Sequence, residues 1–226
     1  MSNLDTDFWW LSSPVTFPQQ LLEELKWLPI REDVEFRFID FDGTLANDKI
    51  RFQLDPELLC HRGNDAIPYI MAKYSTEDDP TGIKNFVKKL IEKLEEEGRW
   101  FLFDNVWEIF DPNNPNDFIL TAWDYTLQNE KIESSWLPKN VNKILVEVPW
   151  DKPLQILETC LRKGFIPWKI KFYDDRIKNF EGVDEQISRA LKGIPVEFFI
   201  AIPEYEKNRV LIERYSGQVG KILSGN

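Results

Sequence analysis

Apolar residues group into short runs along the chain, and their spacing predicts alternating strands and helices. Dense apolar runs predict five strands, at 34–39, 118–121, 143–148, 169–173 and 196–202. Apolar residues at helical spacing predict helices over 81–97, 153–163 and 183–192, and a shorter helical stretch between 103 and 110. Thr81 is the predicted N-terminal cap of the first of these helices.

Strands separated by helical connections are typical of a parallel sheet with helices on both faces. We therefore expect an α/β fold, a three-layer sandwich around a central, mainly parallel five-stranded sheet of the Rossmann-like kind. The main domain would span 34–204. Residues 1–33 would pack on it as an aromatic, partly helical extension, and 205–226 would form a C-terminal extension. Residues 48–80 hold three prolines and only short apolar patches, which favours a small insertion.

Composition and charge narrow the class of protein. With 226 residues, 42% hydrophobic and 14% aromatic, the chain can bury a sizeable core and does not resemble a disordered protein. The net charge of −11 works against non-specific binding to nucleic acid or to an anionic membrane. We find no apolar stretch of the roughly 20 residues that a membrane span needs. No basic region precedes an apolar one at the N-terminus, and the two cysteines are far apart, so we expect a cytoplasmic protein.

Polar residues suited to chemistry stand at the ends of three predicted strands. Asp40 and Asp42 follow the first strand, Thr121 ends the second, and the pair Asp174 and Asp175 follows the fourth. The carboxyl ends of parallel strands meet at one edge of a sheet, where ligands bind. Four carboxylates crowded there repel one another, and a hard divalent cation with oxygen ligands relieves this, which favours Mg²⁺ over Zn²⁺. A phosphate ester held at that metal can be attacked by a carboxylate.

From about residue 34 to 202 the sequence resembles the haloacid dehalogenase (HAD) superfamily of phosphatases. The first motif of that family, Asp-x-Asp-Gly-Thr after an apolar strand, is matched by Asp40-Phe41-Asp42-Gly43-Thr44. The second, a Thr or Ser that closes a strand, is matched by Thr121. The third is a lysine one helix upstream of an acidic pair, and Lys152 fits it best. The fourth is that pair, Asp174-Asp175, whose surroundings also resemble a branch likened to nucleic-acid-end repair enzymes.

The resemblance implies a role for each matched residue. Asp40 would attack the phosphoryl group, and Asp42 would protonate the leaving oxygen and then deprotonate the hydrolytic water. Thr121 would hydrogen-bond phosphoryl oxygens, and Lys152 would neutralise their charge. The predicted Mg²⁺ ligands are Asp40, Asp42, Asp174 and Asp175, with residues 48–80 as the cap that selects the substrate. The implied substrate is a phosphorylated small molecule, a metabolite or a nucleotide.

Several points stay open at the level of sequence. Lys169 and Lys171 lie closer to the acidic pair than Lys152 does, but within a strand. Trp123 stands soon after Thr121, where many relatives carry small residues, and could narrow the mouth of the site or contact substrate. Arg176 could hold a substrate phosphate or pair with Asp124.

Two other functions compete with the first. One is a catalytically degenerate relative that binds a partner protein through its aromatic N-terminus, although the intact first motif argues against it. The other is a phosphatase of nucleic-acid ends, which the net charge disfavours because tight binding needs several basic contacts. We expect no membrane partner, and the sequence does not predict an oligomeric state.

Overall fold

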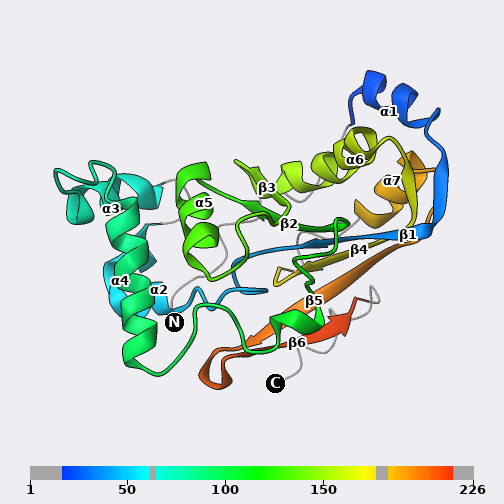
Figure 1. Cartoon of the computed structure of the whole chain (residues 1–226). Coiled ribbons are helices and arrows are strands. Elements are labelled where there is room, and N and C mark those ends of the chain that lie inside the picture. The colour runs from blue at the N-terminus through cyan, green and yellow to red at the C-terminus, as the bar shows by residue number, and fades with distance from the viewer. Residues whose placement is uncertain (1–16, 62–64, 177–182, 216–226) are drawn as a thin grey trace, which may run out of the picture.

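A single twisted sheet forms the centre of the protein (Figure 1). The computed structural model describes residues 17–61, 65–176 and 183–215, and within them the sheet has six strands in the order β3-β2-β1-β4-β5-β6. The strands are β1 (Ile30–Ile39), β2 (Asp117–Ala122), β3 (Lys143–Val146), β4 (Ile166–Asp174), β5 (Val196–Glu204) and β6 (Arg209–Arg214). β1 to β5 are mutually parallel, and β6 runs antiparallel to β5.

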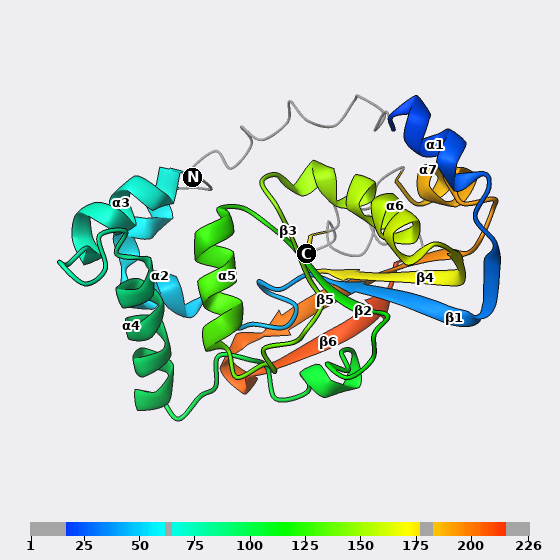
Figure 2. The ribbon, with the colours of Figure 1, turned by 45° about the horizontal axis from the view of Figure 1, so that its top comes forward.

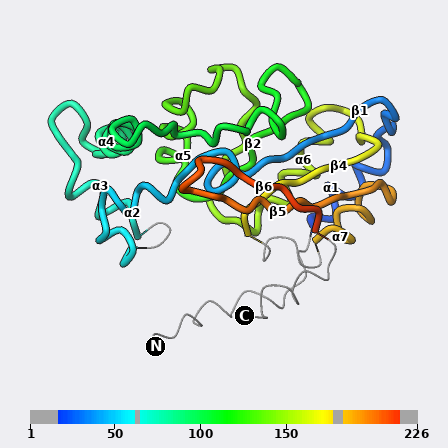
Figure 3. Tube along the Cα trace, turned by 90° about the horizontal axis from the view of Figure 1, so that it is seen from below, coloured from blue at the N-terminus to red at the C-terminus, as the bar shows by residue number. Residues whose placement is uncertain are grey.

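The predicted fold class is therefore confirmed, with one more strand than expected. β5 and β6 form a hairpin through the 3₁₀ turn η7 (Tyr205–Lys207) and Asn208, whose positive φ of 47° suits an Asn (Figure 3). β6 is not predicted because its apolar run, Val210-Leu211-Ile212, is only three residues long and has charged residues on both sides. β1 begins earlier than predicted because its first four residues are exposed and three of them, Arg31 to Asp33, are charged.

One face of the sheet is covered by three helices, as Figure 2 shows: α1 (Gln19–Leu25), α6 (Lys152–Lys163) and α7 (Val183–Ala190). Phe36 and Phe38 of β1 are fully buried in the cluster between these helices and the sheet, together with Leu25 of α1. The alternation along β1 is what directs both rings to this face. The helices predicted over 153–163 and 183–192 correspond to α6 and α7.

The second face is covered by α5 (Tyr125–Ser134), by part of α4 (Ile83–Glu96) and by irregular chain. The helical stretch predicted between 103 and 110 is wrong, because only the three-residue 3₁₀ turn η4 (Val106–Glu108) forms there. Thr81 is not the capping residue of α4, although its hydroxyl accepts a hydrogen bond from the Ile83 N–H at 3.4 Å. Gly82 is the capping residue, and a carboxylate oxygen of Asp79 accepts a hydrogen bond from the Asn85 N–H at 2.9 Å.

Residues 48–80 contribute α2 (Ile50–Leu54), the 3₁₀ helix η2 (Pro56–Cys60) and α3 (Ala66–Tyr74). With α4 they form a group at one end of the molecule, beyond α5 (Figures 1 and 3). This group has an apolar cluster of its own, centred on Ile70 and Phe86. None of the helices in the described ranges is long and apolar enough to cross a membrane.

Candidate active site

The end of β1 lies where the chain changes direction across the sheet. β1 has β2 on one side and β4 on the other. From β2 the order of strands continues to β3 at one edge of the sheet, and from β4 it continues to β5 and β6 at the other edge. In open α/β sheets ligands bind at this switch point, outside the carboxyl ends of the strands. Ile39 pairs with Tyr173 of β4, and the Asp40 N–H donates to the Tyr173 carbonyl oxygen at 2.8 Å. Asp40 and Asp174 therefore leave neighbouring strands side by side.

Three carboxylates meet at this point. Asp40, Asp174 and Asp175 each offer an oxygen atom, and these atoms lie within 4.8 Å of one another. Asp40 and Asp174 are buried, and Oδ1 of Asp175 is buried without a hydrogen-bond donor among the described residues. Oxygen ligands about 2.1 Å from a shared Mg²⁺ lie at most about 4.2 Å apart. The donor set and the unpaired oxygen fit Mg²⁺, and the oxygen atoms, within 4.8 Å of one another, lie near the spacing that a shared ion requires.

Gly43 brings the loop after β1 close to this acidic group. Its φ is +75°, and a Cβ atom there would lie 2.5 Å from Oδ2 of Asp175. A side chain at position 43 would therefore be strained by the backbone and would displace Asp175. The Asp-Gly-Thr part of the first motif thus has a packing reason for its glycine.

Lys152, the first residue of α6, is placed between two of the acids. Its Nζ lies 2.9 Å from Oδ1 of Asp40 and 2.7 Å from Oδ2 of Asp174, and its side chain is only 3% exposed. Burial alone would lower the pKa of this ammonium, but the charges of Asp174 and Asp40 outweigh burial and raise it. Lys169 and Lys171 pair elsewhere, with Glu197 at 2.6 Å and Glu35 at 2.9 Å.

Asp42 is not one of the three acids whose oxygen atoms lie within 4.8 Å of one another. Its carboxylate accepts hydrogen bonds from Lys131 Nζ and, at 2.9 Å, from Gln128 Nε2. Burial would raise the pKa of Asp42, but the nearby charges of Lys131 and Arg51 and the two hydrogen bonds together lower it. The prediction that Asp42 ligates the metal through its side chain is not supported by this placement, whereas its position beside Asp40 suits a proton-transfer role.

Gln128 and Lys131 are site residues that the sequence analysis misses. Both lie on α5, three residues apart and therefore on one helix face. α5 has no apolar stripe because that inward face carries these polar groups. One signal for the helix is present: Asp124 caps it, and Oδ1 of Asp124 accepts from the Leu127 N–H at 2.8 Å.

Thr121 is buried near the carboxyl end of β2, next to β1. Trp123, two residues later, has a φ of 97°. This backbone conformation costs a non-glycine residue about 1–3 kcal/mol and tends to occur at functional sites. The Arg176 guanidinium lies 5.5 Å from the centre of the Trp123 ring and 3.9 Å from Asp175. Asp124 is occupied as the α5 cap, so Arg176 faces the acidic group and not Asp124.

Two carboxyl groups of the site hold their protons unusually well. Burial raises the pKa of Asp40 to about 6; the charge of Lys152 opposes this, and that of Asp174 adds to it. Burial, with the charges of Asp40 and Asp174, raises the pKa of Asp175 to about 8. An acid whose pKa is raised by folding destabilises the fold as pH rises from its unfolded value, near 3.8, through its folded value.

These shifts predict that stabilisation by Mg²⁺ grows with pH. Metal-free protein should lose stability between about pH 4 and about pH 8, and Mg²⁺ should bind more tightly as Asp40 and Asp175 lose their protons. Release of one proton per metal means about a tenfold gain in affinity per pH unit, which corresponds to roughly 3–6 °C in melting temperature. The shift in melting temperature that Mg²⁺ causes can be measured by thermal unfolding at about pH 6, 7 and 8, the range in which the two acids titrate. A shift that does not depend on pH would contradict this account.

Comparisons with known proteins do not assign this chain to a family. No protein-family model matches the sequence, and no curated protein matches it. Among solved structures, the chain is similar to the crystal structure of a HAD family enzyme from Bacteroides thetaiotaomicron, a magnesium complex. The TM-score is 0.33 and the identity 13%, over 73% of this chain and 92% of the other. A likeness at this level carries no function from one protein to the other.

Proposed function

We propose that this chain is a Mg²⁺-dependent phosphohydrolase of the HAD type, which acts on a small phosphate monoester through a phospho-aspartate at Asp40. One observation carries the proposal: Asp40, Asp174 and Asp175 present oxygen atoms within 4.8 Å of one another, and Lys152 is held between the first two. Both features lie at the switch point of the sheet. An acidic metal site beside a buried cation suits the charge of a phosphoryl group.

Asp40, Asp174 and Asp175 would hold the metal, which when bound polarises the phosphoryl oxygens and offsets their charge. A carboxylate oxygen of Asp40 forms a bond to phosphorus as the bond from phosphorus to the leaving alcohol oxygen breaks. Asp42 gives that oxygen a proton. In the second half-reaction Asp42 takes a proton from water, whose oxygen bonds to phosphorus as the bond to Asp40 breaks, and inorganic phosphate leaves.

The remaining residues orient the reacting groups. Lys152 would hydrogen-bond the transferring phosphoryl group and hold Asp40 in place, and the Thr121 hydroxyl would donate to a phosphoryl oxygen. Lys131 and Gln128 hold the carboxylate of Asp42 by hydrogen bonds. Their hydrogen bonds favour the ionised form of Asp42, which accepts a proton from water in the second half-reaction. The proton that Asp42 gives to the leaving oxygen in the first half-reaction would arrive with the substrate, bound as the monoanion of the ester.

The proposal predicts hydrolysis of an aryl phosphate that depends on the metal. Purified protein should hydrolyse p-nitrophenyl phosphate in Mg²⁺ or Mn²⁺, and chelation should lower the rate by roughly 10²-fold, the scale of several kcal/mol of charge stabilisation. Adding Mg²⁺ back should restore it. The absorbance of the p-nitrophenolate that is released follows the reaction. Turnover that survives chelation would overturn the proposal.

A pair of variants separates this effect from a general loss of acidic charge. Asp175→Asn removes one oxygen from the proposed metal site, so the Mg²⁺ concentration for half-maximal activity should rise about tenfold or more. Asp78→Asn removes the same charge from an exposed residue outside the site and should leave that concentration unchanged. Equal effects of both substitutions would contradict the proposed ligand set.

The competing function without catalysis predicts no turnover at all. A chain that only binds a partner has no need for a buried cation between Asp40 and Asp174, because a buried ion pair is weak evidence of stabilisation. We therefore favour chemistry over a purely structural use of these residues.

A further inference from the structure

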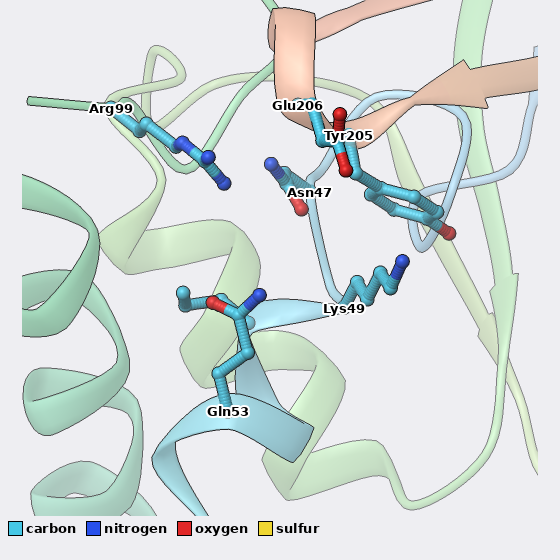
Figure 4. Close-up of a pocket in the computed structure, with 7 residues that line it drawn as sticks. Asn47, Lys49, Gln53, Arg99, Tyr205 and Glu206 are labelled. Carbon is cyan, nitrogen blue, oxygen red and sulfur yellow. The ribbon is translucent and has the colours of Figure 1, made fainter. Parts of the chain in front are cut away.

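A polar pocket of about 310 Å³ opens beside the loop that carries the first motif (Figure 4). Its polar lining comes from separate parts of the chain: Asn47, Lys49, Gln53, Arg99, Tyr205 and Glu206. Asn47 and Lys49 follow β1, and Tyr205 follows β5. The pocket therefore lies at the same edge of the sheet as Asp40 and Asp174, since the carboxyl ends of parallel strands share that edge.

Electrostatic interactions connect this pocket with the acidic group. Asp48, between Asn47 and Lys49 in the chain, is buried, and the charge of Asp42 adds to the effect of burial in raising its pKa. Burial raises the pKa of Tyr205, and the charges of Asp48 and Asp175 raise it further.

The lining carries more positive than negative charge. Lys49 Nζ lies 5.1 Å from the centre of the Tyr205 ring, and no carboxylate of the described residues lies within ion-pair distance of it. Within the described part of the chain Arg99 has one ion pair, with Glu97 at 3.6 Å, and that acid does not line the pocket. Glu206 is the single acid among the lining residues. In Figure 4 the Arg99 side chain extends toward Asn47 from one side of the pocket, and the end of the Lys49 side chain lies beside the Tyr205 ring on the other.

We propose that this pocket binds the alcohol part of the substrate, and that this part carries a second anionic group, held by Lys49 and Arg99. The inference rests on the proposed function, because it concerns the leaving group of the same phosphate ester. A carboxylate and a second phosphate share the required chemistry. At roughly 30 Å³ per water molecule the pocket holds about ten waters, enough for a small sugar acid or sugar phosphate and too little for a polynucleotide.

Matched pairs of esters test this charge preference. 3-Phosphoglycerate is compared with glycerol 3-phosphate, which lacks the carboxylate, and fructose 1,6-bisphosphate with fructose 1-phosphate, which lacks the second phosphate. In at least one pair kcat/KM should be higher for the more anionic ester by about tenfold or more, as expected for a charge-assisted hydrogen bond. The pair that shows the preference identifies the anion.

Substitutions assign the preference to the two cations. Lys49→Met and Arg99→Met should each reduce the ratio of kcat/KM between the two members of the preferred pair by about tenfold, chiefly through KM for the anionic ester. Lys88→Met, which removes a lysine exposed on α4, should leave the ratio unchanged. The ratio is the measured quantity because a variant that is merely less well folded loses activity on both esters alike.

The outcomes distinguish this inference from the proposed function. If p-nitrophenyl phosphate is hydrolysed but neither pair shows a preference, or the preference survives both substitutions, the pocket does not bind an anionic leaving group and the phosphohydrolase proposal stands. If no ester is hydrolysed in Mg²⁺, the proposed function fails, and this inference fails with it.

Discussion

Asp40→Asn is expected to lower kcat by roughly 10³-fold or more, about 4 kcal/mol of barrier, while the protein stays folded. The amide keeps the shape of the side chain and can still occupy its place beside Lys152, but its oxygen is a poor nucleophile. The loss should be found in formation of the phospho-enzyme. It can be measured as the rate of aryl phosphate hydrolysis in excess Mg²⁺. Incorporation of radioactive phosphate into the protein, from an ester labelled in its phosphoryl group, measures the first half-reaction alone.

Stability should move in the opposite direction to activity. Because burial raises the pKa of Asp40 to about 6, the ionised carboxylate destabilises the metal-free fold at pH 8, and a neutral amide avoids that cost. Metal-free Asp40→Asn should therefore unfold at an equal or higher temperature than the original protein at pH 8. Near-normal activity in this variant would mean that Asp40 is not the nucleophile, and Asp174 would become the candidate.

Lys152→Met is expected to cut turnover by roughly 10²-fold or more, as the loss of one charge-stabilising group usually does. The methionine fills much of the space of the lysine stem but leaves Asp40 and Asp174 facing each other without the cation between them. Removing one partner of a buried ion pair costs about 3–5 kcal/mol, so metal-free protein should also unfold at a lower temperature. Mg²⁺ should restore part of that stability, and turnover should be compared in excess Mg²⁺.

Lys169→Met and Lys171→Met are the matched controls. Both lysines lie on β4 and make ion pairs with Glu197 and Glu35, away from the acidic group. Each substitution should change stability by about 1 kcal/mol or less and leave kcat within about twofold. Full activity in Lys152→Met combined with a collapse in either control would reverse the assignment of the lysine.

The strands and the first motif could be predicted from the sequence because local signals agree there. Buried parallel strands carry dense apolar runs, so β1 to β5 stand out, and their ends place Asp40 and Asp174 at one edge without further information. Pairing of Ile39 with Tyr173 then fixes their neighbourhood. This part of the site is determined by strand topology, which the alternation of strands and helices already indicates.

The rest depends on contacts between distant segments. α5 faces the site with Gln128 and Lys131, so the helix lacks the apolar stripe by which helices are recognised. The irregular chain around η4 is apolar because it covers the sheet, not because it is helical. Asn105 shows the reason: its side chain donates to the Val210 carbonyl at 2.8 Å and accepts from the Val210 N–H at 2.9 Å. Such tertiary hydrogen bonds override a local helical pattern.

The central position of β1 has a consequence for biosynthesis. β1 is made early, but one of its two neighbours, β4, lies in the second half of the chain. Until β4 leaves the ribosome, one edge of an apolar strand has no partner, and such an edge is a template for aggregation. The acidic residues that follow β1 and the hydrophilic segment after them keep that region charged while it waits. Ribosome-bound chains that end before β4 should therefore depend on chaperones, and complete chains released from the ribosome should not.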